Sequence, residues 1–171
     1  MRDPLRSCTV EGVKRFWDLF AKDEAFERPL PPARVTLAAI GFVHNDVQKP
    51  RPKGWESVET RIELLPEHLP RARGLERYSH VLVLFYMDLA EDAPEKPAEI
   101  DLKSGRRVGI LASRSQLRPN HLGVSAVPLL GVEGRNIRVK GLDAIDRTPV
   151  LDIKPYLPEY DAHPGATIPP G

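Results

Sequence analysis

The chain has 171 residues with 25 Lys and Arg against 24 Asp and Glu, and this near balance excludes a nucleic-acid-binding protein recognisable by bulk charge. A single cysteine, Cys8, excludes a disulfide framework within the chain and fits a reducing compartment. No apolar run approaches the roughly 20 residues that a membrane-spanning helix needs. The sequence therefore predicts a soluble cytoplasmic protein with no membrane partner, long enough for one domain with a core.

The N-terminal segment has the spacing of a short amphipathic helix. Val10, Val13, Trp17 and Phe20 recur every three or four residues, with charged side chains between them, which predicts a helix within residues 8–26. The prolines of residues 29–32 then predict a stiff extended linker. We expect residues 1–33 to form an N-terminal helical extension, separate from the domain that follows.

The hydrophobic period changes to that of β-strands from residue 34 onward. In residues 57–64, Val58, Thr60, Ile62 and Leu64 share one face and charged residues share the other, as in a strand with one solvated side. Residues 81–87 are apolar throughout, which predicts a strand buried on both faces. Further short strands are expected at 35–43, 108–112, 124–130, 136–140 and 149–153, and a helical turn within 66–77.

This spacing indicates a mainly β fold, either a barrel or a sandwich, with few short helices. The predicted domain spans residues 34–162. Residues 163–171, rich in proline and glycine, are predicted to be a flexible tail.

Charge is distributed unevenly along the domain. Residues 88–101 contain six acids and one lysine, whereas residues 102–132 contain no Asp or Glu. The acid-free segment carries five cations, which are Lys103, Arg106, Arg107, Arg114 and Arg118. This segment predicts a local positive field that attracts an anionic partner, or else a basic loop that opposes the acidic one.

A polar stretch over residues 114–125 lies between two apolar runs. Pro119 fixes its own φ and Asn120 tolerates turn angles, so Arg118 is predicted at a stiff corner. A guanidinium held there can bind a carboxylate or phosphate in a bidentate manner. We expect Arg118 and Asn120 to contact a substrate; the alternative is a surface turn.

A second polar stretch covers residues 143–158. Asp146 and Thr148 lie near a predicted strand end, where they can hydrogen-bond a ligand. Asp152 and Lys154 are two residues apart on one strand face, so they are placed to form an ion pair, and Lys154 is also a substrate-binding candidate.

Several common site signatures are absent. The sequence lacks a GxGxxG motif after a strand, a phosphate-binding GxxxxGK loop and a nucleophile elbow. Its five histidines have no metal-ligand spacing, so no metal site is expected.

Together, the two polar stretches resemble the TsaA-like family of tRNA methyltransferases. The shared motifs are Arg118-Pro119-Asn120-x-x-Gly123-x-Ser125 and a run from Gly141 to Tyr156, joined by Gly74-Leu75-Glu76-x-Tyr78-Ser79-His80 earlier in the chain. The resemblance covers roughly residues 35–161. It implies a small closed β-barrel that pairs as a homodimer, binds S-adenosylmethionine and methylates N6 of threonylcarbamoyladenosine beside the tRNA anticodon.

The resemblance also implies where the site lies. The expected cofactor-binding residues are Lys53, Gly54, Trp55, Met87, Asp88, Arg114, Val124 (by its backbone), Asp146, Arg147, Thr148 and Pro149. A general base would assist loss of the acceptor proton, and the candidates are His121, Asp146 and Tyr156.

The sequence departs from the family pattern at four positions. His121 replaces a proline, Asp88 a histidine, Ser113 a threonine and Arg147 a glycine. The changes at Asp88 and Arg147 fall in the implied cofactor pocket. Two alternatives therefore stay open: a methyltransferase of the same fold acting on a small molecule or another modified base, and a non-catalytic module that binds S-adenosylmethionine or RNA.

Overall fold

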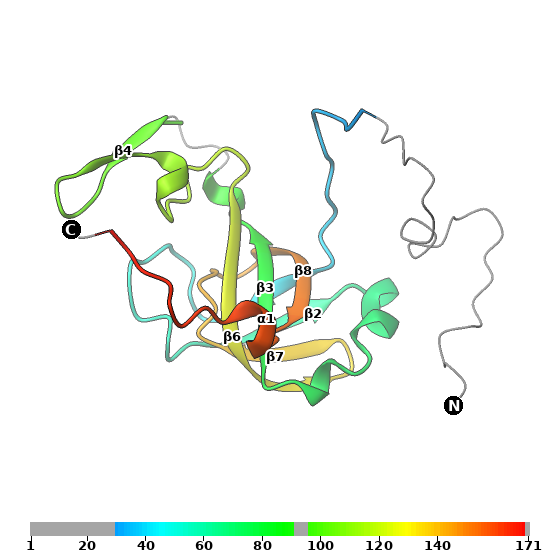
Figure 1. Ribbon diagram of the computed structural model, residues 1–171. Helices are drawn as coiled ribbons and strands as arrows, with labels where there is room; N and C mark the ends of the chain where they lie inside the picture. The colour runs from blue at the N-terminus through cyan, green and yellow to red at the C-terminus, as the bar shows by residue number, and fades with distance from the viewer. Residues whose placement is uncertain (1–29, 91–95, 170–171) are drawn as a thin grey trace, which may run out of the picture. The chain divides into compact units, whose positions relative to one another are not determined.

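A computed structural model describes residues 30–90 and 96–169 (Figure 1). The chain divides into two compact units, residues 1–36 and residues 37–171. In the first unit the described residues, 30–36, form neither helix nor strand, and the helix predicted within residues 8–26 lies outside the described residues. Every element below belongs to the second unit.

Six antiparallel strands close into a barrel in the order β1-β2-β7-β6-β3-β8. Their bounds are β1 (Gly41–His44), β2 (Glu59–Leu64), β3 (His80–Tyr86), β6 (Leu122–Glu133), β7 (Asn136–Lys140) and β8 (Pro149–Pro155). Closure gives every strand two hydrogen-bonded neighbours and removes exposed sheet edges. The prediction of a mainly β, closed barrel is confirmed, and the sandwich alternative is wrong.

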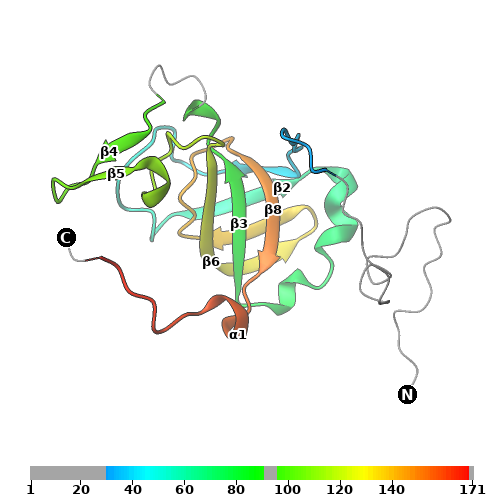
Figure 2. The ribbon, with the colours of Figure 1, turned by 45° about the horizontal axis from the view of Figure 1, so that its top comes forward.

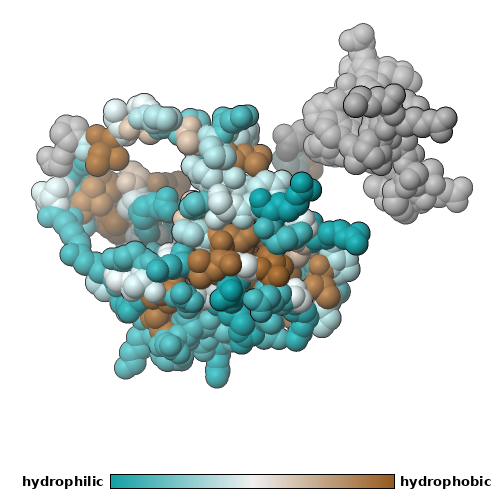
Figure 3. Space-filling view, turned by 90° about the horizontal axis from the view of Figure 1, so that it is seen from below, coloured by the Kyte–Doolittle hydropathy of each residue, from teal (hydrophilic) through white to brown (hydrophobic). Residues whose placement is uncertain are grey.

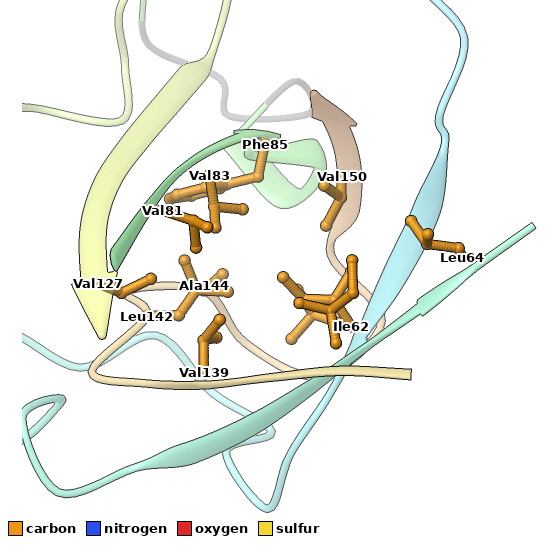
Figure 4. Close-up of a cluster of buried hydrophobic side chains, with 12 residues drawn as sticks. Ile62, Leu64, Val81, Val83, Phe85, Val127, Val139, Leu142, Ala144 and Val150 are labelled. Atoms are coloured by element: carbon orange, nitrogen blue, oxygen red, sulfur yellow. The ribbon is translucent and has the colours of Figure 1, made fainter. Parts of the chain in front are cut away.

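The alternating strand pattern fills the barrel with aliphatic side chains (Figure 4). Alternate residues of β2, β3 and β7 point inward and are buried, such as Ile62, Val83 and Val139, each with none of its surface exposed. Leu142 and Ala144, from the segment between β7 and β8, are also buried in this core. That segment therefore packs into the barrel and is fixed in position beside the strand ends.

Strand β3 differs from its prediction of burial on both faces. Val81, Val83 and Phe85 are buried, but Leu82, Leu84 and Tyr86 on the other face are only half-buried in the single chain. A barrel wall has one inner face, and nothing else in the described chain fully covers the outer face of β3. The apolar outer residues thus remain partly accessible.

Two other predicted strands are shorter than expected. Residues 35–40 are not part of a strand, because pairing of β1 with β2 and β8 begins only at Gly41. There a side-chain Cβ would lie 2.5 Å from the Glu63 carbonyl oxygen, so glycine permits the close approach of β1 and β2. Predicted strand 108–112 is divided between β5 (Arg107–Gly109) and the short 3-10 helix η5 (Ile110–Ala112).

The remaining elements are short. Strands β4 (Glu99–Asp101) and β5 form a separate hairpin beside the barrel (Figure 2). Three more 3-10 helices, η2 (Pro66–Ala72), η3 (Leu75–Arg77) and η4 (Asp88–Ala90), flank β3, and η2 and η3 occupy the turn predicted within 66–77. Helix α1 (Pro158–Asp161) follows β8. Of the described helices, none is long and apolar enough to cross a bilayer.

Candidate functional site

A cavity of about 360 Å³ opens at the end of the barrel where β3 finishes and β6 begins. Its volume lies at the lower end of the range typical of ligand pockets. Segments far apart in sequence contribute to its wall. The lining residues are Pro50, Arg51, Trp55, Phe85, Met87, Asp88, Leu89, Ala90, Arg114, Gln116, Arg118, Leu122, Gly123, Val124, Ser125, Asp143, Ala144, Ile145 and Thr148.

The inner wall of the cavity depends on a glycine. Gly123 is paired with Phe85 across β3 and β6, and a Cβ on Gly123 would lie 2.3 Å from the Phe85 ring. The absent side chain leaves room for the ring, which is 96% buried and forms one side of the cavity. The Arg-Pro-Asn-x-x-Gly spacing therefore has a packing reason at its last position.

Arg51 and Trp55 form one lip of the cavity. The Trp55 indole N–H donates to the Arg51 carbonyl oxygen at 3.0 Å, and the Arg51 guanidinium lies 4.9 Å from the Trp55 ring centroid. The same guanidinium donates to the carbonyl oxygen of Gly54, whose φ of 83° turns the chain back. This local network places an aromatic face and a cation at the cavity mouth.

Two arginines of the acid-free segment, from the loop that precedes β6, line the cavity. The Arg114 guanidinium donates to the Val124 carbonyl oxygen at 3.2 Å, and the Arg118 guanidinium donates to the Ser113 carbonyl oxygen at 3.2 Å. Each uses one donor on the backbone and keeps others available, because a guanidinium has five N–H groups. The stiff corner predicted at Arg118 thus faces the cavity with part of its donor set unused.

Carboxylates face these cations. Asp88 and Asp143 line the same cavity as Arg51, Arg114 and Arg118. The protein around the Asp143 carboxyl group raises its pKa, and the positive charge of Arg114 partly offsets this shift. The cavity thus combines both signs of charge with an apolar inner surface.

The segment from Asp143 to Thr148 is held by a hydrogen-bonded asparagine at the end of β1. The Asn45 side-chain amide donates to the Thr60 hydroxyl at 3.1 Å and to the Ala144 carbonyl oxygen at 2.9 Å. The Asn45 backbone N–H donates to the Asp146 carboxylate at 3.3 Å. Arg147 adopts a φ of 69°, and its backbone N–H donates to the Val43 carbonyl oxygen. These bonds fix Ile145 and Thr148 at the cavity.

His121 is 96% buried and lies outside the cavity lining. Its Nδ1 is 3.0 Å from the Gln116 carbonyl oxygen, and its ring contacts Tyr86 edge-on at 6.2 Å between centroids. Its φ of 49° is one that a proline could not adopt. His121 therefore anchors the loop 113–121 against β3, and this chain shapes the loop differently from a chain with proline there.

The structure brings together part of the predicted site. Six of the predicted cofactor residues line the cavity: Trp55, Met87, Asp88, Arg114, Val124 and Thr148, joined by the predicted substrate residue Arg118. Lys53 and Gly54 belong to the adjoining loop, and Asn120 lies in the exposed turn beyond Arg118. Asp146, Arg147 and Pro149 are sequence neighbours of Thr148 but do not line the cavity.

Strand β8 separates the second polar stretch into two distant parts. Asp146 and Thr148 precede β8 at the cavity end. Lys154, in contrast, lies opposite Leu82 in the strand register, and the Tyr156 backbone N–H donates to the His80 carbonyl oxygen at the start of β3. The six residue steps of β3 from His80 to Tyr86 correspond to roughly 20 Å. The base candidate Tyr156 and the substrate candidate Lys154 therefore lie toward the other end of the barrel. Lys154 pairs with Asp152 at 2.8 Å, as its spacing predicted.

Several cavity residues had no sequence signal of their own. Arg51 belongs to a loop of variable spacing, Phe85 reads as a core residue, and Asp143 reads as one acid among several. A cavity can be recognised only once the fold brings the end of β3 and the segment 141–148 together at one end of the barrel. Neither segment indicates this by its sequence alone. Within residues 30–90 and 96–169, no His, Cys, Asp or Glu side chains group as metal ligands.

Comparison with known proteins identifies a family for this architecture. The model of the tRNA-methyltransferase O N-terminal domain matches residues 43–162. A probable S-adenosyl-L-methionine-binding protein of Methanothermobacter thermautotrophicus is 38% identical over 132 residues, which cover 75% of this chain and 94% of that protein. The human tRNA (adenine(37)-N6)-methyltransferase is 40% identical over 109 residues, 61% of this chain and 24% of that protein.

A solved structure agrees in fold. The crystal structure of TrmO from Pseudomonas aeruginosa superposes with a TM-score of 0.62 and 33% identity, over 78% of this chain and 61% of that one. This chain thus spans about three fifths of the solved protein and about a quarter of the human one. The family model covers most of the barrel unit and includes every lining residue of the cavity. The chain belongs to the tRNA-methyltransferase O N-terminal domain family.

Proposed function

We propose that this protein is an S-adenosylmethionine-dependent methyltransferase that acts on tRNA, with the cavity at the end of β3 as its cofactor site. The observation that carries the proposal is the cavity's mixed lining, in which Arg114 and Asp143 face one space beside the ring of Phe85. The cofactor carries a carboxylate, an ammonium, an adenine and a sulfonium, and this lining offers a partner for each. Relatives named as S-adenosyl-L-methionine-binding proteins support the same assignment.

Residues of this chain have distinct tasks in this proposal. Arg114, tied to β6 through Val124, holds a carboxylate; Asp88 or Asp143 receives an ammonium or ribose hydroxyl; Trp55 offers a face to an adenine. The cofactor supplies an electrophilic methyl group. Its transfer depends mainly on aligning the acceptor nitrogen with that methyl group and on excluding water. A small cavity that encloses the cofactor would serve both requirements.

The proposed acceptor is N6 of threonylcarbamoyladenosine in the tRNA anticodon loop. The relatives named tRNA (adenine(37)-N6)-methyltransferase support an adenine nitrogen. Asp88 and Asp143 are the carboxylates placed to accept the acceptor proton, since both line the cavity whereas His121, Asp146 and Tyr156 do not. The proposed location of the reaction is the cytoplasm, where the substrate would be drawn from the tRNA pool.

The experiment has two stages. S-adenosylmethionine in excess is expected to raise the unfolding temperature, and absence of any shift would remove both the enzyme and the cofactor-binding module. Labelled cofactor is then incubated with total tRNA from a strain lacking the methylation, and nucleosides are separated. Label in methylated threonylcarbamoyladenosine supports the proposal; label only in another nucleoside or in small-molecule extracts would favour the alternative acceptors. Cofactor binding without transfer would favour a non-catalytic module.

We further propose that the protein forms a homodimer through the outer faces of β3 and β6. Every outward residue of β6 from 122 to 130 is apolar: Leu122, Val124, Ala126, Pro128 and Leu130. Strand β3 adds two half-buried apolar neighbours in register, Leu82 and Leu84. A contiguous apolar patch of this kind is typical of an interface. Leu122 and Val124 also belong to the cavity rim, so a second copy seated here would border the cavity.

The oligomeric state tests this face directly. Light scattering after size exclusion is expected to give twice the chain mass of 19.2 kDa, and Ala126→Glu is expected to give a monomer. Ser104→Glu in the β4–β5 hairpin is the charge-matched control and should remain dimeric. A monomeric wild-type protein at micromolar concentration would remove the proposal.

A further inference from the structure

A second hollow lies at the end of the barrel opposite the cavity. It has a volume of about 690 Å³ and is lined by η2, η3, the residues around them and the end of β8. The lining residues are Arg71, Ala72, Arg73, Gly74, Leu75, Arg77, Tyr78, Ile153 and Pro155, and we call this surface the arginine groove. Strand β3 runs from this end to the cavity, a separation of roughly 20 Å for six residue steps.

All the formal charge in the arginine groove is positive. Arg71, Arg73 and Arg77 are exposed, and the described part of the chain provides none of them with an ion pair. Five other arginines, at positions 61, 107, 135, 138 and 147, each pair with a carboxylate. Three unpaired guanidiniums in one hollow repel one another, so the arrangement favours an anion that bridges them.

The neighbouring carboxylates do not enter the groove. Glu76 accepts a hydrogen bond at 2.9 Å from the backbone N–H of Gly74, which holds it in the turn, and Asp152 is paired with Lys154 at 2.8 Å. Neither lines the hollow. These two acids therefore moderate the field around the arginines without occupying the space between them.

The floor of the groove is apolar and carries an aromatic ring. Leu75 and Ile153 pack against the barrel core, and Tyr78 is 41% exposed beside Arg77. Figure 3 views this end of the molecule from below, where brown atoms gather in the middle with teal atoms around them. An apolar floor with a phenol ring under a rim of guanidiniums suits a ligand that has both phosphates and flat bases.

We propose that the arginine groove binds the sugar-phosphate backbone of the RNA substrate at a point remote from the methylated base, with Tyr78 stacking on a nucleobase. The inference rests on the proposed tRNA methyltransferase function and adds to it a second contact, on the other end of the barrel. RNA is favoured over an acidic peptide because its charge repeats along the whole strand. A stem-loop held with its target base in the cavity still presents phosphates about 20 Å away.

The test removes the three charges together. The variant Arg71→Gln/Arg73→Gln/Arg77→Gln is expected to raise KM for tRNA about tenfold, with kcat and the affinity for S-adenosylmethionine unchanged. Because each lost phosphate contact reduces the salt slope by about 0.7 for single-stranded RNA, the slope of log affinity against log salt should fall by about 2. The triple lysine variant at the same positions keeps the charges and should restore most of the slope.

A matched control comes from strands β2 and β7 and the turn before β7, none of which lines the groove. The variant Arg61→Gln/Arg135→Gln/Arg138→Gln loses the same net charge, but its arginines already pair with Glu63 or Glu133. It should change KM and the salt slope far less. If both triple variants changed KM and the salt slope equally, the proposal would be overturned, because the effect would then come from the overall charge of the protein.

Failure of this inference can be told apart from failure of the proposed function. If the wild-type protein does not methylate tRNA, the function fails and the groove proposal fails with it. If the wild-type protein methylates tRNA and the groove variant keeps the wild-type KM and salt slope, only the groove proposal is overturned. Failure of the lysine variant to recover the slope would also overturn it.

Discussion

The two ends of the barrel hold hollows of opposite character. At the cavity end, Arg51, Arg114 and Arg118 share the space with Asp88 and Asp143, and much of the lining is apolar. At the groove end, Arg71, Arg73 and Arg77 stand without any carboxylate in the lining. A site of mixed charge suits a small zwitterion, whereas a site of one sign suits a polyanion. The barrel core between them keeps the two sites at a fixed separation.

The ends also differ in how rigidly they are built. The cavity wall includes buried Thr148 and the close contact of Gly123 with Phe85, and buried His121 anchors the adjoining loop. The groove is made of two 3-10 helices, the end of β8 and exposed arginine side chains. Substitutions at the cavity should therefore affect folding and cofactor binding together. Substitutions in the groove should affect substrate affinity alone.

The largest effect is expected for Gly123→Ala. Its Cβ would overlap the buried Phe85 ring at 2.3 Å, and overpacking of this kind costs about 1–3 kcal/mol. The ring is expected to move into the cavity, so S-adenosylmethionine should no longer shift the unfolding temperature. Gly131→Ala on the same strand is the control, since its Cβ would meet only Arg138 at an ordinary 3.5 Å. Cofactor binding unchanged in Gly123→Ala would show that Phe85 does not define the cavity.

The next effect is expected for Arg114→Gln. Loss of a charged hydrogen bond to a ligand costs about 1.5–3 kcal/mol, which corresponds to a rise of about 10- to 150-fold in the Kd for S-adenosylmethionine. Titration calorimetry measures this Kd directly. Arg107→Gln, in the same acid-free segment but paired with Glu99, should bind the cofactor normally. Similar losses in both variants would point to a general field and not to a contact at Arg114.

A smaller gain in stability is expected for Arg147→Gly. Arg147 has a φ of 69°, which costs a residue with a Cβ about 1–2 kcal/mol, and glycine adopts this conformation without that cost. The exposed ion pair with Asp146 at 3.6 Å contributes little in return. The unfolding temperature should rise by a few degrees. Arg147→Ala removes the same ion pair but keeps the Cβ, so equal stability of the two variants would exclude strain as the cause.

Local patterns predicted most of the barrel strands because their residues alternate between buried and exposed, but they left a barrel and a sandwich open, and only the family resemblance implied the closed barrel. The spacing of Thr60, Ile62 and Leu64 fixed which face of β2 is buried, and the structure follows it. The pattern failed for β3, since a strand with two apolar faces reads the same whether its outer face meets a helix or remains open for a partner chain. Sequence periodicity reports side-chain polarity and not the identity of the covering layer.

The candidate site was predictable where one segment carries several of its residues. The Arg114–Ser125 stretch was selected by its turn chemistry, and Arg114, Arg118 and Gly123 line the cavity. Arg51 and Asp143 were not selected, because their proximity depends on how loops of different strands meet. The groove arginines were missed for the same reason: in sequence they belong to a polar turn, and only the approach of β8 gives them an apolar floor.

The smallest effect is expected for Asp143→Asn, and its sign depends on pH. Asp143 is exposed, but the protein around its carboxyl group removes part of its hydration and raises its pKa above the usual value. The folded protein therefore disfavours the ionised form relative to the unfolded chain. Asp143 therefore lowers stability once the pH rises through its folded-state pKa, and it has no such cost below about 3.9, where the unfolded aspartate is protonated. Asp143→Asn should be more stable than the wild-type protein at pH 7, and the difference in unfolding temperature should vanish in strong acid. Asp101→Asn in the β4–β5 hairpin is the control and should leave stability unchanged at both pH values. If the wild-type protein were instead more stable than Asp143→Asn at pH 7, the attraction of Arg114 would outweigh the lost hydration of Asp143. The charges at the cavity end would then be balanced without a ligand.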